Sequence, residues 1–274
     1  MRSSSNTWGE ESQATLTQNK ISEGHDCYQR GKLFVVGIGP GSLLDLTPRA
    51  KEAIVEADVV VGYDTYLKLI AELITEKETF GTGMMQEVDR CQAAVDRAAA
   101  GKKIAVVSSG DSGIYGMAGL VLELAMKVPE PYRPEVEIIA GISAVSASAA
   151  ILGAPLMHDF AVISLSDLLT PWPLIMKRAE MAAEGDFVIA LYNPRSKKRV
   201  KQIETVREIL LKHRKKETPV GIVRQAGRSE QQMTISDLEH FTQEEIDMFS
   251  LVIIGNSQTY VEAGRMITPR GYQL

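Results

Sequence analysis

The sequence predicts an α/β protein in which short buried strands alternate with helices. Two apolar runs, Leu33–Val36 and Ile104–Val107, each end at a glycine-rich loop, and helix-forming sequence follows both loops. Strand and helix patterns then alternate along the chain, which is typical of a parallel sheet built from βαβ units. The length of 274 residues suggests two domains rather than one.

The N-terminal domain is predicted to hold a mostly parallel sheet. Thr47 and Pro48 supply an N-cap and a proline in the first helical turn, and alanines and Ile54 then mark one apolar helix face. Residues 81–83 are expected to form a loop, and Gly101 is expected to stop a helix. Strands are predicted at 33–38, 59–63, 103–108 and 136–139, and helices at 48–57, 66–74, 88–98, 115–127 and 142–152.

The C-terminal domain is predicted to hold a mixed sheet. The small and rigid residues 153–155 suggest a linker, so the domains are expected at 32–154 and 155–274, after a flexible tail of residues 1–31. Strands are predicted at 160–165, 187–192, 219–224, 232–236 and 251–255, the last three at least partly antiparallel. Helices are predicted at 172–183 and 200–210, the second with an apolar stripe from Val200 to Leu210.

Composition and charge exclude several classes of protein. A net charge of −5 gives no electrostatic footprint for nucleic acid, so none is expected as a partner. The uncharged stretch 138–157 contains glycines, a proline and serines, so it is interpreted as a strand and a buried helix rather than a membrane span. Two cysteines and four scattered histidines predict neither disulfides nor a metal site, and a cytoplasmic location is expected.

The first glycine loop is expected to bind a ligand. Its spacing approaches the dinucleotide fingerprint, but Ser42 takes the place of the third glycine, and Pro40 lacks the N–H that a pyrophosphate would use. A nicotinamide enzyme and a purely structural turn remain as alternatives. A loop for a ligand less anionic than a dinucleotide fits these residues better.

The second glycine loop adds a carboxylate, Asp111. A turn-forming or helix-capping aspartate is the plain interpretation. Because two such loops in one sheet favour ligand binding, Asp111 is also a candidate for holding a cationic or hydroxyl-rich ligand such as S-adenosylmethionine.

Ten Lys and Arg residues lie between Arg195 and Lys216. A solvated helix face is the plain interpretation. Arg195 and Lys197, however, follow a predicted strand end, where they could bind the carboxylates of a substrate.

Taken together, the motifs resemble the tetrapyrrole (corrin/porphyrin) methylase family, the class III S-adenosylmethionine-dependent methyltransferases. They are GIGPG at 37–41, SSGDSGIYG at 108–116, AGISA at 140–144, LYNP at 191–194 and the strand end at 223–226. Further segments, GTGM at 81–84, SLSDLLTPW at 164–172 and LYNPRS at 191–196, look most like the branch that methylates carbon 17 of precorrin-3B.

The resemblance implies a cleft between two α/β domains in which S-adenosylmethionine binds, and a homodimer. Ser112, Ala140 and the sequence Arg224–Ala226 depart from the family pattern, the last making the role of Ala226 less certain. Carried over by position, the residues expected to contact the donor are Pro40, Ser109, Gly110, Asp111, Ile114, Ser143, Ala144, Asn193 and Ala226.

The implied reaction is methylation of ring carbon 17 of precorrin-3B or cobalt-precorrin-3B, coupled to ring contraction, in cobalamin biosynthesis. S-adenosylhomocysteine would be the second product. Asp111 would hold the donor or manage a proton during contraction. Methylation of another ring carbon, and a non-enzymatic sensor of adenosine-type ligands, remain alternatives.

Overall fold

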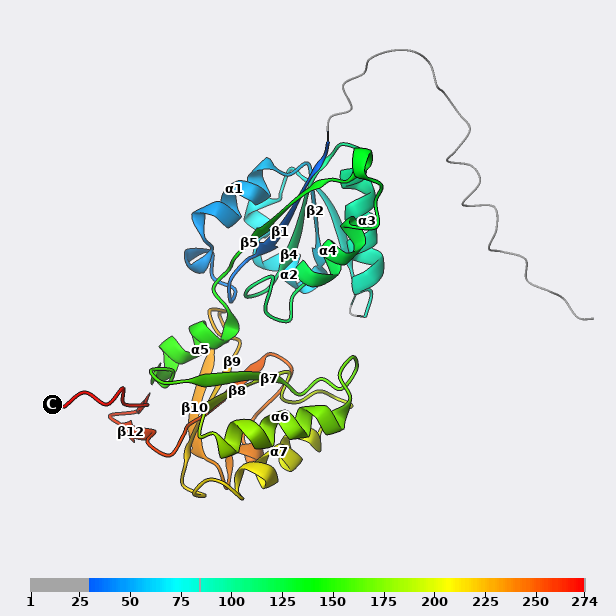
Figure 1. Cartoon of the computed structure of the whole chain (residues 1–274). Coiled ribbons are helices and arrows are strands. Elements are labelled where there is room, and N and C mark those ends of the chain that lie inside the picture. The colour runs from blue at the N-terminus through cyan, green and yellow to red at the C-terminus, as the bar shows by residue number, and fades with distance from the viewer. Residues whose placement is uncertain (1–29, 84, 274) are drawn as a thin grey trace, which may run out of the picture.

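The computed structural model describes residues 30–83 and 85–273, which form an N-terminal and a C-terminal α/β body (Figure 1). The expected tail lies outside the described residues except for its last two positions. None of the helices in the described residues combines the length and the hydrophobicity that a membrane crossing requires.

The N-terminal sheet, predicted to be mostly parallel, is entirely parallel. Its strands are β1 (Lys32–Gly37), β2 (Val59–Tyr63), β3 (Glu78–Thr82), β4 (Lys103–Ser108) and β5 (Glu135–Ile139), in the order β3-β2-β4-β1-β5. Alternate side chains of β1 pack into different cores: Leu33 and Val35 on one face, Phe34 and Val36 on the other. Helices cover both faces, which explains why β1, β2 and β4 are continuous apolar runs.

Helices α3 (Glu87–Ala99) and α4 (Ala118–Ala125) cover one face, and α1 (Pro48–Glu56) and α2 (Asp64–Leu69) cover the other. Thr47 caps α1 as predicted, since its Oγ1 accepts a hydrogen bond from the N–H of Ala50 at 3.1 Å. Short 3₁₀ turns lie at Leu43–Asp45 (η1), Ala71–Leu73 (η2) and Glu130–Tyr132 (η3).

Three predicted elements of this body differ from the structure. Residues 81 and 82 belong to the edge strand β3, not to a loop, and its polar, exposed residues hid the strand pattern. The helix expected at 66–74 begins at Asp64 and ends at Leu69. The helix expected from Tyr115 begins at Ala118, because Tyr115 has a φ of 54°.

The C-terminal sheet is mixed, as predicted, in the order β10-β9-β11-β8-β7. Strands β7 (Phe160–Ser164) and β8 (Val188–Tyr192) are parallel. Strands β9 (Pro219–Arg224), β10 (Gln232–Asp237) and β11 (Ser250–Ile254) pair antiparallel, and β11 also pairs antiparallel with β8. Helices α6 (Trp172–Glu184) and α7 (Gln202–Leu210) cover one face, near the turn η4 (Phe241–Gln243). Val200, expected in the core stripe, is 49% exposed and precedes α7.

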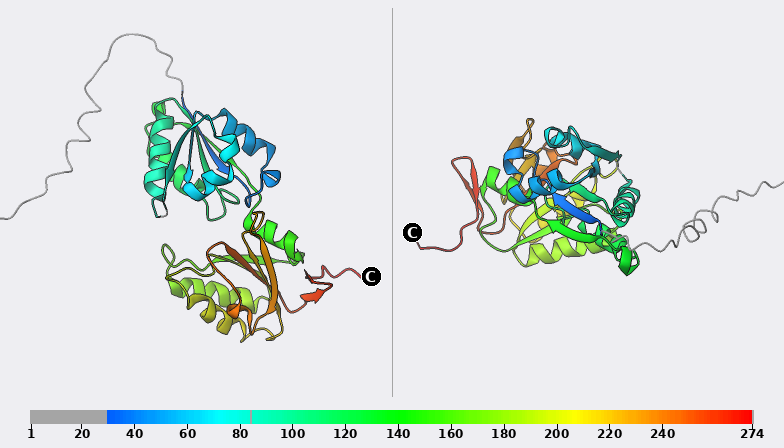
Figure 2. Two further views of the ribbon diagram at one scale, coloured as in Figure 1. Left: turned by 180° about the vertical axis from the view of Figure 1, so that it is seen from behind. Right: turned by 90° about the horizontal axis from the view of Figure 1, so that it is seen from above.

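Helix α5 (Ala144–Leu152) covers the other face of the C-terminal sheet (Figures 1 and 2). Its Val145, Ala149 and Leu152 pack against apolar residues of β8, β9 and β11. The chain therefore crosses between the sheets at 140–143, before α5, and not at 153–155. Residues 153 and 154 form β6 (Gly153–Ala154), which pairs with β13 (Arg265–Ile267) beside β12 (Tyr260–Glu262).

Candidate functional site

The two glycine loops lie side by side at the carboxyl ends of the central strands β1 and β4. Gly39 donates its N–H to the carbonyl of Gly110 at 3.0 Å, and Gly110 donates to the carbonyl of Gly39 at 2.7 Å. Both residues have positive φ, at 75° and 70°, which glycine adopts without a Cβ clash. The expectation that both loops serve one site agrees with this geometry, since ligands of open α/β sheets bind beyond the carboxyl ends of the strands.

A third segment joins the two loops at the crossing between the bodies. A Cβ placed on Gly37 would lie 2.7 Å from both the carbonyl oxygen of Gly110 and the backbone nitrogen of Gly141. The backbones of three chain segments therefore touch at Gly37, and a side chain at this position would force them apart.

The Asp111 carboxylate fixes this junction. Its Oδ1 accepts a hydrogen bond from the N–H of Gly113 at 2.8 Å, and its Oδ2 accepts one from the N–H of Gly141 at 3.0 Å. The turn-forming role considered from the sequence is thus present. Asp111 also lines the cavity described next, so it both orders the loop and faces the site.

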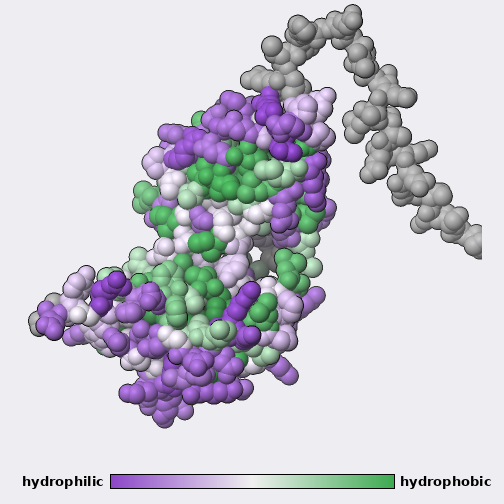
Figure 3. Space-filling view, viewed as in Figure 1, coloured by the Kyte–Doolittle hydropathy of each residue, from purple (hydrophilic) through white to green (hydrophobic). Residues whose placement is uncertain are grey.

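A cavity of about 180 Å³ lies between the two bodies, where the surface is hollowed (Figure 3). One wall is formed by the glycine loops, another by α5, and the third by the ends of β8, β9 and β11. Eight of the nine residues expected to contact the donor line it: Pro40, Ser109, Gly110, Asp111, Ile114, Ala144, Asn193 and Ala226.

Ser143, the ninth, is not among the lining residues. It is buried as the N-cap of α5, and its Oγ accepts a hydrogen bond from the N–H of Ser146 at 3.3 Å. One turn later in α5, Ser148 does line the cavity. Its hydroxyl is fully buried and has no hydrogen-bond partner within the described residues.

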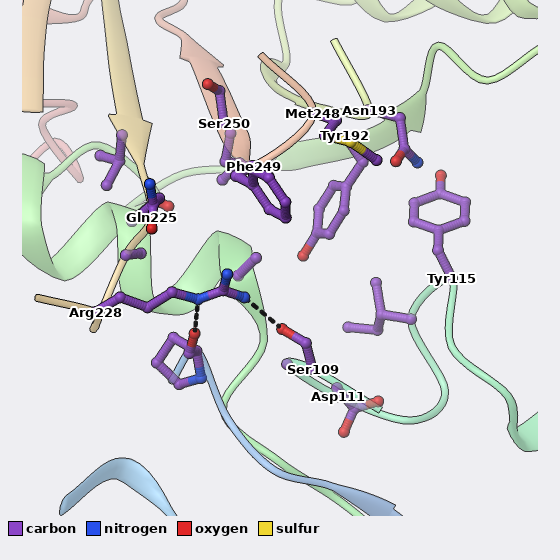
Figure 4. Close-up of a pocket in the computed structure, with 18 of the residues that line it drawn as sticks. Ser109, Asp111, Tyr115, Tyr192, Asn193, Gln225, Arg228, Met248, Phe249 and Ser250 are labelled. Carbon is purple, nitrogen blue, oxygen red and sulfur yellow. Dashed lines mark hydrogen bonds between the residues drawn. The ribbon is translucent and has the colours of Figure 1, made fainter. Parts of the chain in front are cut away.

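Two tyrosines, one from each body and in contact with each other, line the cavity (Figure 4). The Tyr115 hydroxyl donates to the carbonyl of Val162 at 3.3 Å, and the Tyr192 hydroxyl accepts from the N–H of Val145 at 3.0 Å. Their ring centroids lie 5.2 Å apart. Burial raises the pKa of both phenols, so both rings are neutral at pH 7.

Strained backbone is found on the C-terminal wall of the cavity. Asn193 and Gln225 have φ values of 49° and 51°, which non-glycine residues rarely adopt. The Asn193 side chain donates to the hydroxyl of Ser164 at 3.0 Å, and this bond fixes the direction of its amide.

Sequence reasoning missed Arg228, which lies in the turn between β9 and β10 and lines the cavity (Figure 4). Its Nε donates to the carbonyl of Pro40 at 3.2 Å, and its Nη2 to the Ser109 hydroxyl at 3.5 Å. The guanidinium also lies 5.5 Å from the ring centroid of Phe249. Burial lowers its pKa. No motif spacing marked this residue, because the hairpin turn alone brings it to the first loop.

Arg195 and Lys197 do not line the cavity. Arg195 Nη2 donates to the carbonyl of Thr242 at 3.0 Å and lies 3.5 Å from Glu204 Oε1. Lys197 is exposed to solvent. The turn at 193–194 directs the segment away from the cavity, which the sequence did not show. Within the described residues, no group of three or more His, Cys, Asp and Glu could hold a metal ion.

Two α/β bodies with paired glycine loops and a cavity between them are typical of a class of α/β proteins that bind a small molecule. The comparisons with known proteins identify the family. The chain belongs to the Tetrapyrrole (Corrin/Porphyrin) Methylases, whose family model matches residues 32–242, so it is a methyltransferase.

Several curated relatives match most of the chain. It is 51% identical over 242 residues to the probable cobalt-factor III C(17)-methyltransferase of Salmonella typhimurium, with 88% of this chain and 100% of the relative covered. It is 50% identical to the cobalt-factor III methyltransferase of Priestia megaterium, over 89% of this chain, but spans only 46% of that longer protein. The precorrin-3B C(17)-methyltransferase of a Sinorhizobium species is 40% identical, with 88% and 97% covered.

Solved structures share the fold. The crystal structure of the methyltransferase CobJ matches with a TM-score of 0.82 and 38% identity, covering 87% of this chain and all of that one. A uroporphyrin-III C-methyl transferase from Thermus thermophilus, complexed with S-adenosyl homocysteine, matches with a TM-score of 0.63 over 82% of this chain and 97% of that one. At 22% identity, the second likeness concerns the fold alone.

Proposed function

We propose that this protein transfers a methyl group from S-adenosylmethionine to carbon 17 of a precorrin-3B-type tetrapyrrole, coupled to ring contraction, in cobalamin biosynthesis. The observation that carries the proposal is the interdomain cavity, in which both glycine loops meet α5. The two relatives near 50% identity are named for cobalt-factor III and the relative at 40% for precorrin-3B, which favours a cobalt-containing substrate.

The groups that line the cavity suit S-adenosylmethionine. Pro40 and Gly110 bring backbone to its surface with little side-chain bulk. The buried hydroxyl of Ser148 lacks a partner in the described residues, and an unpaired buried polar atom indicates a ligand group that would satisfy it. Asn193 and Ser109 add polar groups that suit a ribose or an amino acid.

When bound, the donor supplies a sulfonium methyl group that is already electrophilic, so the chain needs chiefly to align the reactants and exclude water. The two neutral tyrosine rings, Tyr115 and Tyr192, line the cavity without offering a charge. Asp111 has both carboxylate oxygens engaged by backbone N–H groups. We therefore assign it a positioning role rather than proton transfer.

The test is product analysis with purified protein, S-adenosylmethionine and either cobalt-factor III or precorrin-3B. The expected product carries one added methyl group, located at carbon 17 by NMR, in a contracted ring. Faster turnover of the cobalt-containing substrate is expected. A methyl group at another carbon would support a sister activity, and S-adenosylhomocysteine binding without transfer to any tetrapyrrole would support a sensor.

A homodimer and a cytoplasmic location complete the proposal. The dimer rests on the family resemblance. The location rests on the cysteine content of this biosynthetic enzyme, because two cysteines offer no disulfide framework and therefore suit a reducing compartment. Sedimentation equilibrium should give twice the chain mass, whereas a monomer at all concentrations would contradict the dimer.

A further inference from the structure

Arg228 carries more hydrogen-bonding capacity than the protein uses. A guanidinium has five N–H donors in a planar fork. Two of them bind the Pro40 carbonyl and the Ser109 hydroxyl. The other three have no hydrogen-bond partner within the described residues. Figure 4 shows the third nitrogen pointing away from Ser109, toward the side of the cavity where Phe249 lies.

The charge of Arg228 is also uncompensated. Among the described residues that line the cavity, Arg228 is the only cation and Asp111 the only anion. The Asp111 carboxylate binds backbone N–H groups, and no ion pair joins it or any other described acidic residue to Arg228. Burial lowers the pKa of Arg228, yet a guanidinium remains charged at neutral pH. A partly buried charge of this kind is stabilised by an anion that enters the cavity.

We propose that Arg228 binds a carboxylate of the molecule held in the cavity, through the N–H groups of its fork that remain free. This inference rests on the proposed function, which offers two sources of that carboxylate. One is the amino acid part of the methyl donor, and the other is an acidic side chain of the tetrapyrrole. Planar guanidinium–carboxylate pairing suits both. The contacts to Pro40 and Ser109 hold the fork in place from the opposite body.

Calorimetry separates recognition of a carboxylate from mere support of the loops. The ligands are S-adenosylhomocysteine and 5′-methylthioadenosine, which keeps the nucleoside but lacks the amino acid. The variants are Arg228→Gln and Arg228→Lys, with Arg224→Gln as the matched control. Arg224 has the same charge on the same hairpin but lies outside the cavity, where it pairs with Glu245 and Asp247. Circular dichroism and thermal melting of each variant check that it is folded.

If the carboxylate belongs to the donor, Arg228→Gln weakens S-adenosylhomocysteine binding on the order of 10- to 100-fold and leaves 5′-methylthioadenosine binding unchanged. Arg228→Lys recovers part of the affinity, because it keeps the charge without the fork. If the carboxylate belongs to the tetrapyrrole, both nucleosides bind normally and the KM for the tetrapyrrole rises by a similar factor. Arg224→Gln changes none of these values.

An equal loss for both nucleosides in Arg228→Gln would overturn the inference, since Arg228 would then only position the loops. Unchanged nucleoside affinities together with an unchanged KM would overturn it as well. A wild-type protein that binds neither nucleoside and methylates no tetrapyrrole would contradict the proposed function and the inference together. If the wild-type protein binds the nucleosides and methylates the tetrapyrrole, a failed prediction for the variants concerns Arg228 alone.

Discussion

Gly39 and Gly110 hold each other through two backbone hydrogen bonds, so the loops that follow β1 and β4 form one unit. Both bonds use groups of the chain itself and require no ligand. The floor of the cavity is therefore built into the fold before anything binds, which is the preorganisation that a methyl transfer between two bound reactants needs.

Gly37→Ala should damage this floor. The added Cβ would approach two backbone atoms to 2.7 Å, and backbone cannot move aside as a side chain can. We expect the free energy of unfolding in urea to fall by about 1–3 kcal/mol, and S-adenosylhomocysteine binding to weaken. Gly119→Ala is the control, because it lies in α4 with no atom within 4 Å of the added Cβ. That variant should gain about 0.5–1 kcal/mol. Equal stability of the two variants would contradict the close approach.

Asp111→Asn should weaken donor binding by loosening the loop. An amide keeps one acceptor oxygen where the carboxylate used two, so one of the N–H groups of Gly113 and Gly141 loses its partner. We expect a stability loss of about 1–2 kcal/mol and a lower affinity for S-adenosylhomocysteine. Asp58→Asn is the control, since Asp58 accepts from the N–H of Lys103 at 2.8 Å and does not line the cavity. It should leave affinity unchanged. Normal affinity with collapsed turnover in Asp111→Asn would instead assign Asp111 a catalytic role.

Much of the architecture could be predicted from the sequence because buried parallel strands leave a clear pattern. Apolar runs that end at glycine marked β1 and β4, and their pairing brought the two loops together as expected. The edge strand β3 was not predicted, because one of its sides is exposed and its residues are mostly polar. The sequence did not predict that the chain changes sheet before α5, because a buried helix has apolar residues whichever sheet it covers.

Motifs marked several of the residues that line the cavity, whereas a residue that only tertiary contacts bring there was missed. Pro40, Asp111 and Asn193 follow strand ends, and all three line the cavity. Arg228 comes to the cavity through a hairpin turn with no signature of its own. Arg195 follows a strand end too, but the chain turns first, and its guanidinium binds the Thr242 carbonyl.

Ser148→Ala should move stability and binding in opposite directions. Removing a buried hydroxyl that has no partner in the described residues should leave the free energy of unfolding unchanged or raise it by about 1 kcal/mol. The affinity for S-adenosylhomocysteine should fall about fivefold to tenfold, as for the loss of one hydrogen bond to a ligand. Ser146→Ala, on the same helix but outside the cavity, should not weaken binding. If Ser148→Ala bound as tightly as wild type, its hydroxyl would not face the donor.

The buried thiol of Cys91 should make stability depend on pH in the alkaline range. Burial raises its pKa from 9.0 to about 11, so the folded state keeps the proton that the unfolded state loses. This contribution is fully present below pH 9 and is lost as the pH rises toward 11, by about 2–3 kcal/mol at most. Urea unfolding at pH 8 and pH 10.5 measures it, and Cys91→Ala should remove this part of the pH dependence. In a Cys27→Ser background, rapid modification of the remaining thiol in folded protein at pH 8 would contradict the burial.

The position of α5 determines which fragments of the chain can stand alone. A fragment beginning at residue 155 would leave the apolar residues of β8, β9 and β11 on one face without their covering helix, and we expect it to aggregate. A fragment beginning at Ser143 retains both the helix and its N-cap. Expressing the protein as two separate pieces should therefore succeed only when the cut falls ahead of that helix.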